Sequence, residues 1–174
     1  SSAAQPFIGF AQHAIPSLAE LDSFKPVMQR SGCTIDRQAI EYSYPNLKPI
    51  GPEELYTAAA ELGIANAPIL SGEAFSDTSV LARSDLNQFS ILHFATHGLT
   101  EGLWGGCAKA PPALVTSLGS GGSDGILSFD EIATLKLDAN LVFLSACDTA
   151  TGITSEELVR STGGQELGSS LEGL

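Results

Sequence analysis

The chain has 174 residues, a length that suits one domain, and 43% of them are apolar, which is enough to bury a core. It carries 8 Lys and Arg against 20 Asp and Glu, so its formal net charge is −12. A surface this acidic repels phosphate backbones and anionic lipids, so we expect neither nucleic acid nor a membrane as a ligand. No apolar run is long enough for a membrane span and no signal segment opens the chain, so we expect a cytoplasmic protein.

The cysteines and the two ends of the chain are less informative about function. Cys33, Cys107 and Cys147 are odd in number and widely scattered, which predicts neither a disulfide framework nor a zinc knuckle and favours a reducing compartment. We assign no role to Cys33 or Cys107. The chain opens without an initiator methionine and stops at Leu174 without a terminating signal, so we expect a piece of a longer protein.

The N-terminal half predicts short elements around a long irregular stretch. Residues 6–10 form a strand-length apolar run. Residues 67–71 predict a second short strand, in which Pro68 indicates either an edge strand or the first position of the strand. Residues 13–50 contain four prolines and no sustained period, so we expect an irregular connection with one short helix at 18–28. Pro52, two acids in the first turn and a closing glycine predict a helix over 51–63. Ser76 can cap another helix that runs to about 86.

The C-terminal half alternates strands and helices more clearly. Residues 90–97 and 141–147 are apolar runs that predict buried strands. Residues 98–125 are rich in Gly and Pro and predict a loop with a flexible tip at 119–125. Ser128 and Glu131 form a capping box ahead of a helix at 129–136, and a last helix is expected from about 164. This alternation predicts an α/β fold with a mainly parallel sheet.

Both long strand runs lead to residues that can do chemistry. The first ends at His97 and the second at Cys147. The carboxyl ends of parallel strands lie at one edge of a sheet, where ligands bind, so these two side chains are expected to meet there. An imidazole beside a thiol promotes the thiolate and then protonates a leaving amine, as in cysteine hydrolases. The backbone N–H groups of Gly98 and Cys147 are the expected oxyanion donors.

Two structural interpretations compete with this one. Buried cysteines at strand ends are common core residues, and a lone strand histidine more often serves the structure than a reaction. His93 lies on the same face as His97 but about 13 Å deeper at roughly 3.3 Å per residue, so only His97 reaches the rim. The spacing of these histidines would suit a metal site on a helix, and Phe94 stands where a metalloprotease has its glutamate, so we expect no metal and no cofactor.

Four segments together resemble the CHAT family of caspase-like domains. They are His-Phe-Ala-Thr-His-Gly at 93–98, the run from Gly125 to Ile132, the run from Lys136 to Gly152, and Gly-Gln-Glu-Leu at 164–167. The likeness extends from about 46 to the end of the chain and is strongest over 91–152. It implies a caspase-like three-layer α/β sandwich, related to caspases, separases and gingipains, with strand order 2-1-3-4 here and the later strands missing. Residues 1–174 would then be the N-terminal, large-subunit-like part of such a domain, truncated at its C-terminal end.

The resemblance also implies roles for individual residues. His97 and Cys147 would be the dyad of a cysteine endopeptidase that cuts an extended protein segment through an acyl-enzyme, and His93 a structural histidine. Asp148 follows the nucleophile in a region that shapes the substrate pocket, so it would favour a basic side chain before the cut. Family members often follow tetratricopeptide-type repeats and act in bacterial signalling, so an upstream repeat partner is expected in the parent chain.

An inactive interaction or scaffolding module is the alternative function. The presence of both His97 and Cys147 argues against it, whereas the incomplete substrate groove argues for it. The strand ending at Cys147 would have a bare edge, so we expect this chain to self-associate and to be poorly active on its own. The loop at 100–125 is either an exosite or gate over the dyad, or a solvated variable loop, and its composition favours the second.

Overall fold

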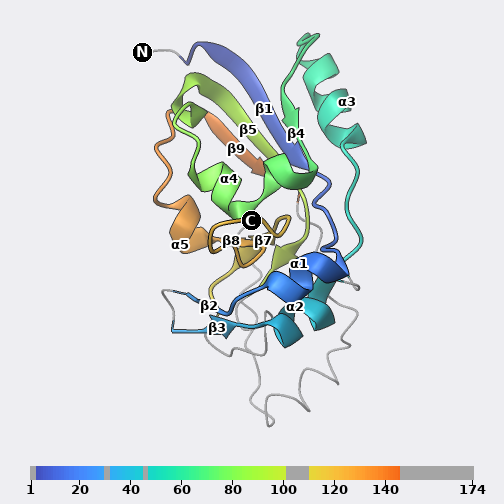
Figure 1. Ribbon diagram of the computed structural model, residues 1–174. Coiled ribbons are helices and arrows are strands. Elements are labelled where there is room, and N and C mark those ends of the chain that lie inside the picture. Colours follow the sequence, from blue (N-terminus) through green and yellow to red (C-terminus); the bar gives the residue numbers. More distant parts are fainter. Residues whose placement is uncertain (1–2, 30–31, 45–46, 101–109, 146–174) are drawn as a thin grey trace, which may run out of the picture.

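The computed structural model describes residues 3–29, 32–44, 47–100 and 110–145. A central parallel sheet of four strands lies at the top of Figure 1, and a smaller antiparallel sheet with two short helices lies below it. The α/β class predicted from the alternation of elements is confirmed. The last helix, predicted from about 164, falls outside the described residues.

The central sheet has the strand order that the resemblance to the CHAT family implies. Its strands are β4 (Ile69–Leu70), β1 (Gln5–Ala11), β5 (Phe89–Ala95) and β9 (Leu141–Leu144), in the spatial order β4-β1-β5-β9 and all parallel. In order of appearance this is 2-1-3-4, with the short strand β4 at one edge, one of the two alternatives that Pro68 indicated. The register places His93 opposite Gly9 of β1 and Phe143 of β9.

Alternating side chains of β1 build a core on each face of the sheet. On one face, Phe7 and Ala11 pack with Leu55 and Ala59 of α3 (Glu53–Glu61). On the other face, Ile8 and Phe10 belong to a cluster that includes residues of α4 (Asp77–Leu81), of the 3₁₀ turns η2 (Gly72–Phe75) and η3 (Leu86–Gln88), and of α5 (Phe129–Ile132). Helices therefore cover both faces, which gives the three-layer sandwich typical of parallel sheets.

The helix starts that carry a capping signal in the sequence are confirmed. The Ser76 hydroxyl accepts the N–H of Ser79 at the start of α4, and Ser128 and Glu131 form a complete capping box at the start of α5. A side-chain cap replaces a missing backbone partner at the first turn, which is why such starts can be recognised locally. Both helices end earlier than predicted, α4 at Leu81 and α5 at Ile132.

The stretch at 13–50 is more regular than predicted. It holds α1 (Leu18–Ser23), a hairpin of β2 (Val27–Met28) and β3 (Thr34–Ile35), and α2 (Arg37–Ser43), whose N-cap Asp36 accepts the N–H of Ala39. The helix predicted over 18–28 stops at Ser23. Pro26 explains this, because a proline disfavours helical geometry in the residue before it and supplies no N–H.

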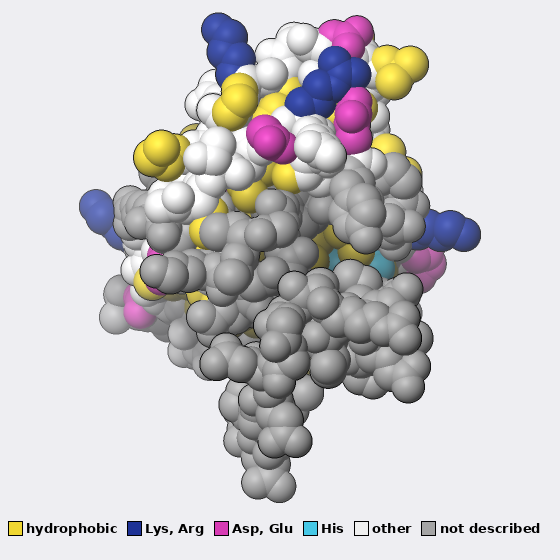
Figure 2. Space-filling view, turned by 90° about the horizontal axis from the view of Figure 1, so that it is seen from below, with side chains coloured by type: hydrophobic (Ala, Val, Ile, Leu, Met, Phe, Trp, Pro, Cys, Tyr) yellow, Lys and Arg dark blue, Asp and Glu magenta, His cyan; other side chains and the backbone are white. Residues whose placement is uncertain are grey.

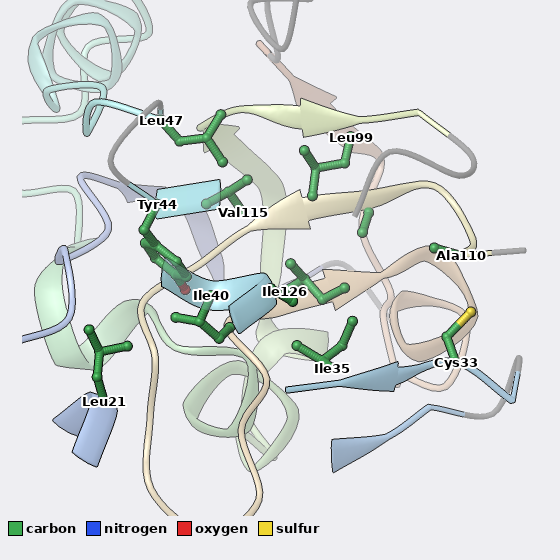
Figure 3. Packing of buried hydrophobic residues seen from close by; sticks show 12 residues of the cluster. Leu21, Cys33, Ile35, Ile40, Tyr44, Leu47, Leu99, Ala110, Val115 and Ile126 are labelled. Carbon is green, nitrogen blue, oxygen red and sulfur yellow. The ribbon is translucent and has the colours of Figure 1, made fainter. Parts of the chain in front are cut away.

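The prediction of a solvated loop at 100–125 is wrong for the part that the structure describes. The antiparallel strands β6 (Gly98–Leu99), β7 (Ala113–Val115) and β8 (Ile126–Ser128) form the small sheet, and Figure 3 shows their side chains packed against residues of α2 and β3. This cluster, called the second core below, is separate from the two clusters that cover the faces of the central sheet. Its buried members are Leu21, Cys33, Ile35, Ala39, Ile40, Tyr44, Leu47, Leu99, Ala110, Ala113, Val115 and Ile126.

Two buried carboxylates fix the segment that was expected to be a flexible tip. Asp77 and Asp124 are 3% and 4% exposed. Asp77 accepts the hydroxyl of Ser123 and, at 3.2 Å, the N–H of Asp124, while Asp124 accepts an amide hydrogen of Gln29 at 2.9 Å. Burial raises the pKa of both acids, that of Asp124 to about 7. The tip is therefore bound to the start of α4 rather than free in solvent.

Cys33 departs from the sequence-based expectation. It is buried in the second core and is disulfide-bonded. Disulfides are rare in reducing compartments, so the cysteines no longer favour a reducing compartment for this protein. Among the residues that the structure describes, no helix is long and apolar enough to cross a membrane.

Gly125 offers a test of how the second core is packed. Its φ is +78°, and a Cβ there would overlap the hydroxyl of Tyr44, which donates to the carbonyls of Thr116 at 2.7 Å and Gly125 at 3.1 Å. We expect Gly125→Ala to lower the free energy of unfolding by about 2–5 kcal/mol, the sum of left-handed strain and overpacking. Gly121, with φ +73° and nothing within 4 Å of an added Cβ, is the matched control. Gly121→Ala should cost about 1–2 kcal/mol, and equal losses in urea denaturation would contradict the packing shown here.

Because the pKa of Asp124 is raised, replacing this residue with asparagine should increase the free energy of unfolding by an amount that depends on pH. Between its ordinary value near 4 and about 7, the folded protein keeps a proton on Asp124 that the unfolded chain has lost, so this group favours folding less as the pH rises. Asparagine does not ionise. Relative to the wild type, Asp124→Asn should therefore gain about 2–3 kcal/mol of unfolding free energy between pH 5 and pH 8.

The comparison must be made between the two proteins at each pH. Burial lowers the pKa of His13 to about 4, so the unfolded chain takes up a proton at His13 below about pH 6.5 while the folded protein does not. That group stabilises less as the pH falls, which opposes Asp124 in the wild type but cancels in the difference. Asp130→Asn, which removes an exposed carboxylate, is the control variant. If the difference in unfolding free energy between Asp124→Asn and the wild type does not change with pH, the raised pKa of Asp124 is wrong.

Candidate active site

His97 lies where the two sheets join. The strand β5 ends at Ala95, and the hydroxyl of Thr96 then donates to the carbonyl of Val115 at 2.6 Å. The N–H of Val115 donates back to the carbonyl of His97 at 2.9 Å. These bonds fix the backbone of His97 between the central sheet and β7, and only 7% of the residue is exposed. In Figure 2, which looks at the molecule from below in Figure 1, histidine surface is visible beside hydrophobic side chains.

The side chain of His97 is held by a backbone carbonyl. Its Nε2 lies 2.6 Å from the carbonyl oxygen of Lys48, in the segment that leads into α3. A carbonyl oxygen can only accept, so Nε2 must carry the hydrogen of this bond. In the neutral ring Nδ1 is then the basic nitrogen. The Lys48 carbonyl thus selects one tautomer and fixes the plane of the ring.

The backbone N–H of Gly98 is not used by the neighbouring strand. Gly98 pairs with Leu114, and the bond from Val115 to the His97 carbonyl makes this a non-hydrogen-bonded pair of the antiparallel ladder. Gly98 is also partly exposed. Its N–H therefore points away from β7 and lies outside the β6–β7 ladder, as an oxyanion donor would require.

Cys147 and Asp148, the other two predicted site residues, lie outside the described residues. The strand that leads to them is described, and its register is informative. Phe94 of β5 is opposite Leu144 of β9, and the N–H of Ser145 donates to the carbonyl of Phe94 at 2.9 Å. Cys147 follows Leu144 by three residues, as His97 follows Phe94.

His93 occupies the interior of the sheet, 4% exposed. Its Nε2 lies 3.0 Å from the hydroxyl of Ser145 and 3.2 Å from a carboxylate oxygen of Glu54 on α3. Burial lowers the pKa of His93, and the attraction of Glu54 opposes that shift. Serine and carboxylate face the same ring nitrogen, whereas a serine hydrolase triad needs one on each nitrogen. His93 therefore links β5, β9 and α3 and does not form a second catalytic centre with Ser145.

The structure adds residues that sequence reasoning did not select. The Lys48 carbonyl has no sequence signature, since every residue carries one. Ser145 has a faint signal, because it stands two residues before Cys147 in the sequence. His13 had none, yet its ring centroid lies 6.0 Å from that of His97. Within the described ranges, no group of three or more His, Cys, Asp or Glu residues could hold a metal ion.

Comparison with known proteins agrees with this geometry. The sequence profile of the CHAT domain family matches residues 17–167, which is most of the chain. This family is caspase-like and related to peptidases, and the four-stranded parallel sheet with helices on both faces is the corresponding α/β sandwich. No curated protein and no solved structure matches the chain. The motifs, the strand order and the profile together show that the chain belongs to the CHAT domain family.

Proposed function

We propose that this chain is a cysteine endopeptidase domain in which His97 and Cys147 form the catalytic dyad. The observation that carries the proposal is the bond between His97 Nε2 and the Lys48 carbonyl. The bond puts the hydrogen of the neutral ring on Nε2 and the lone pair on Nδ1, in a residue that follows β5 at the edge of the sheet where ligands bind. The matching offsets of His97 and Cys147 from the registered pair Phe94 and Leu144 support a meeting of the two side chains.

The proposed reaction uses each group in turn. His97 Nδ1 takes the thiol proton of Cys147, and the thiolate sulfur attacks the carbonyl carbon of the peptide. The N–H groups of Gly98 and Cys147 stabilise the oxyanion. The C–N bond breaks as His97 returns the proton to the leaving amine, which leaves a thioester. Water, deprotonated by His97, then hydrolyses the thioester and releases the acid with the thiol restored.

The substrate class follows from charge. The proposed substrate is an extended protein segment, and Asp148, directly after the nucleophile, would favour a basic side chain before the cut. The formal charge of −12 supports this preference, since it steers cationic segments toward the protein. A tetratricopeptide-type repeat in the parent protein and a cytoplasmic location remain part of the proposal; the disulfide at Cys33 does not support the second.

A role in assembly without catalysis is the second candidate. One observation favours it: Leu141, Val142 and Phe143 of β9 are 49%, 40% and 46% exposed. A row of apolar side chains on a strand that has no outer neighbour in the described part of the sheet invites pairing with another chain. If the chain acts only in assembly through β9, replacing Cys147 should change no cleavage product.

A proteome-wide cleavage assay tests the peptidase. We expect the full-length protein to generate new N-termini preceded by Lys or Arg, and Cys147→Ala or His97→Gln to lower the rate roughly a thousandfold or more, because each removes one half of the dyad. New N-termini are mapped by mass spectrometry after incubation with a cell extract.

The matched control is Glu61→Gln, an exposed change at the end of α3 that should leave every cleavage in place. Thermal unfolding of each variant separates loss of activity from loss of fold. The same products from the Cys147→Ala variant and the wild type would refute the dyad and leave assembly as the function.

A further inference from the structure

His13 is a buried histidine beside the proposed general base. It follows β1 by two residues and is 1% exposed. Its ring meets that of His97 edge to face, with centroids 6.0 Å apart and planes at 71°. On another side it meets the ring of Tyr44, at the C-cap of α2, at 5.8 Å.

The ring of His13 is fixed in one tautomer. Its Nε2 lies 3.0 Å from the carbonyl oxygen of Leu47, which can only accept a hydrogen bond, so Nε2 carries the hydrogen. Nδ1 then holds a lone pair, and it is buried with no hydrogen-bond partner among the described residues. A buried polar atom without a partner costs stability, so such an atom in a native protein calls for an explanation.

The carbonyl that His13 binds is next in the chain to the carbonyl that orients His97. Leu47 is bound by His13, and Lys48 is bound by His97. Two residues further on, the carbonyl of Ile50 accepts the N–H of Gln12 at 2.8 Å. The two residues after β1 therefore hold this segment on both sides of the carbonyl that orients His97.

The backbone that carries His13 is itself fixed. Gln12 is the one described residue other than glycine with a positive φ, 52°. Its carbonyl accepts the N–H of Gly72 at 2.9 Å, while its own N–H binds Ile50. A non-glycine residue keeps left-handed geometry only where its surroundings impose it. The chain is thus turned sharply at Gln12 so that His13 meets Leu47.

We propose that His13 is a positioning residue for His97. By holding Leu47 it places the Lys48 carbonyl where it keeps His97 in the Nε2–H tautomer, with Nδ1 facing the reaction. The proposal rests on the proposed function for its catalytic consequence, but the orientation of His97 can be tested alone. Burial and the nearby His97 also lower the pKa of His13 to about 4, although the bond to Leu47 opposes that shift, so His13 adds no charge beside the base at neutral pH.

The first test is NMR of the histidine rings, which is simple because the chain has only three histidines. Ring ¹⁵N shifts report which nitrogen carries the hydrogen. We expect His97 to be the Nε2–H tautomer in the wild type and in His13→Gln, whose amide nitrogen can replace Nε2 as donor to Leu47. In His13→Leu, which has no donor, the His97 shifts should move toward a mixture of tautomers. An unchanged His97 tautomer in His13→Leu would overturn the proposal.

Two further variants make the result independent of folding. Phe75→Leu alters a fully buried residue in the core on the other face of the sheet and should leave His97 unchanged. If it shifts His97 as His13→Leu does, the effect is general loosening and the proposal fails. Should His13→Leu not fold, His13→Asn replaces it, because its shorter amide does not reach the position of Nε2. His13→Asn must then shift His97 while His13→Gln does not.

The catalytic consequence is read from the thiol. Iodoacetamide alkylates thiolates, so the rate at Cys147, followed by mass spectrometry at neutral pH, reports activation by His97. We expect roughly a tenfold lower rate in His13→Leu and the wild-type rate in His13→Gln. Equal rates in the wild type and His97→Gln would refute the dyad, whereas the NMR result would still decide the role of His13.

Discussion

The parallel pairing of β5 with β1 on one side and β9 on the other brings the described residues of the proposed site to one edge of the sheet. Parallel strands end at the same edge, so the residues that follow β1, β5 and β9 arrive there together. His13 follows β1, His97 follows β5 and Ser145 follows β9. The small antiparallel sheet depends on the same pairing, because its first strand begins directly after His97.

The histidines at the edge of the sheet have different hydrogen-bond partners from the histidine in its interior. Inside, His93 is satisfied by Ser145 and Glu54 from two neighbouring elements. At the edge, the two imidazoles are bound by successive backbone carbonyls, Leu47 and Lys48. Backbone carbonyls orient a ring without adding charge. The two carbonyls therefore fix the planes of both rings at this edge, which a general base needs before it can act.

Sequence patterns revealed the elements whose signals are local. The long strands and the helix starts at Ser76 and Ser128 were predictable, because apolar runs and caps depend on a few consecutive residues. The strand order was predicted only through the resemblance to the CHAT family. The small sheet was not, since β6, β7 and β8 are two or three residues long and are buried by α2, which lies far away in sequence. At the site, His97 and Gly98 could be selected by motif. The Lys48 carbonyl and His13 could not, because their roles depend on where a distant loop passes.

The choice of histidine at position 13 can be argued from magnitudes. The Leu47 carbonyl needs a donor in a buried place, and a cationic donor would stand about 6 Å from His97. At an effective dielectric constant near 20, a unit charge at that distance would repel a proton arriving at His97 by about 3 kcal/mol. A neutral imidazole avoids this repulsion and leaves one unpaired nitrogen, at a cost of about 1–3 kcal/mol in stability. The two costs are similar in size, but they fall on different properties. The charge would weaken the base in every turnover, whereas the unpaired nitrogen lowers only the stability of the fold.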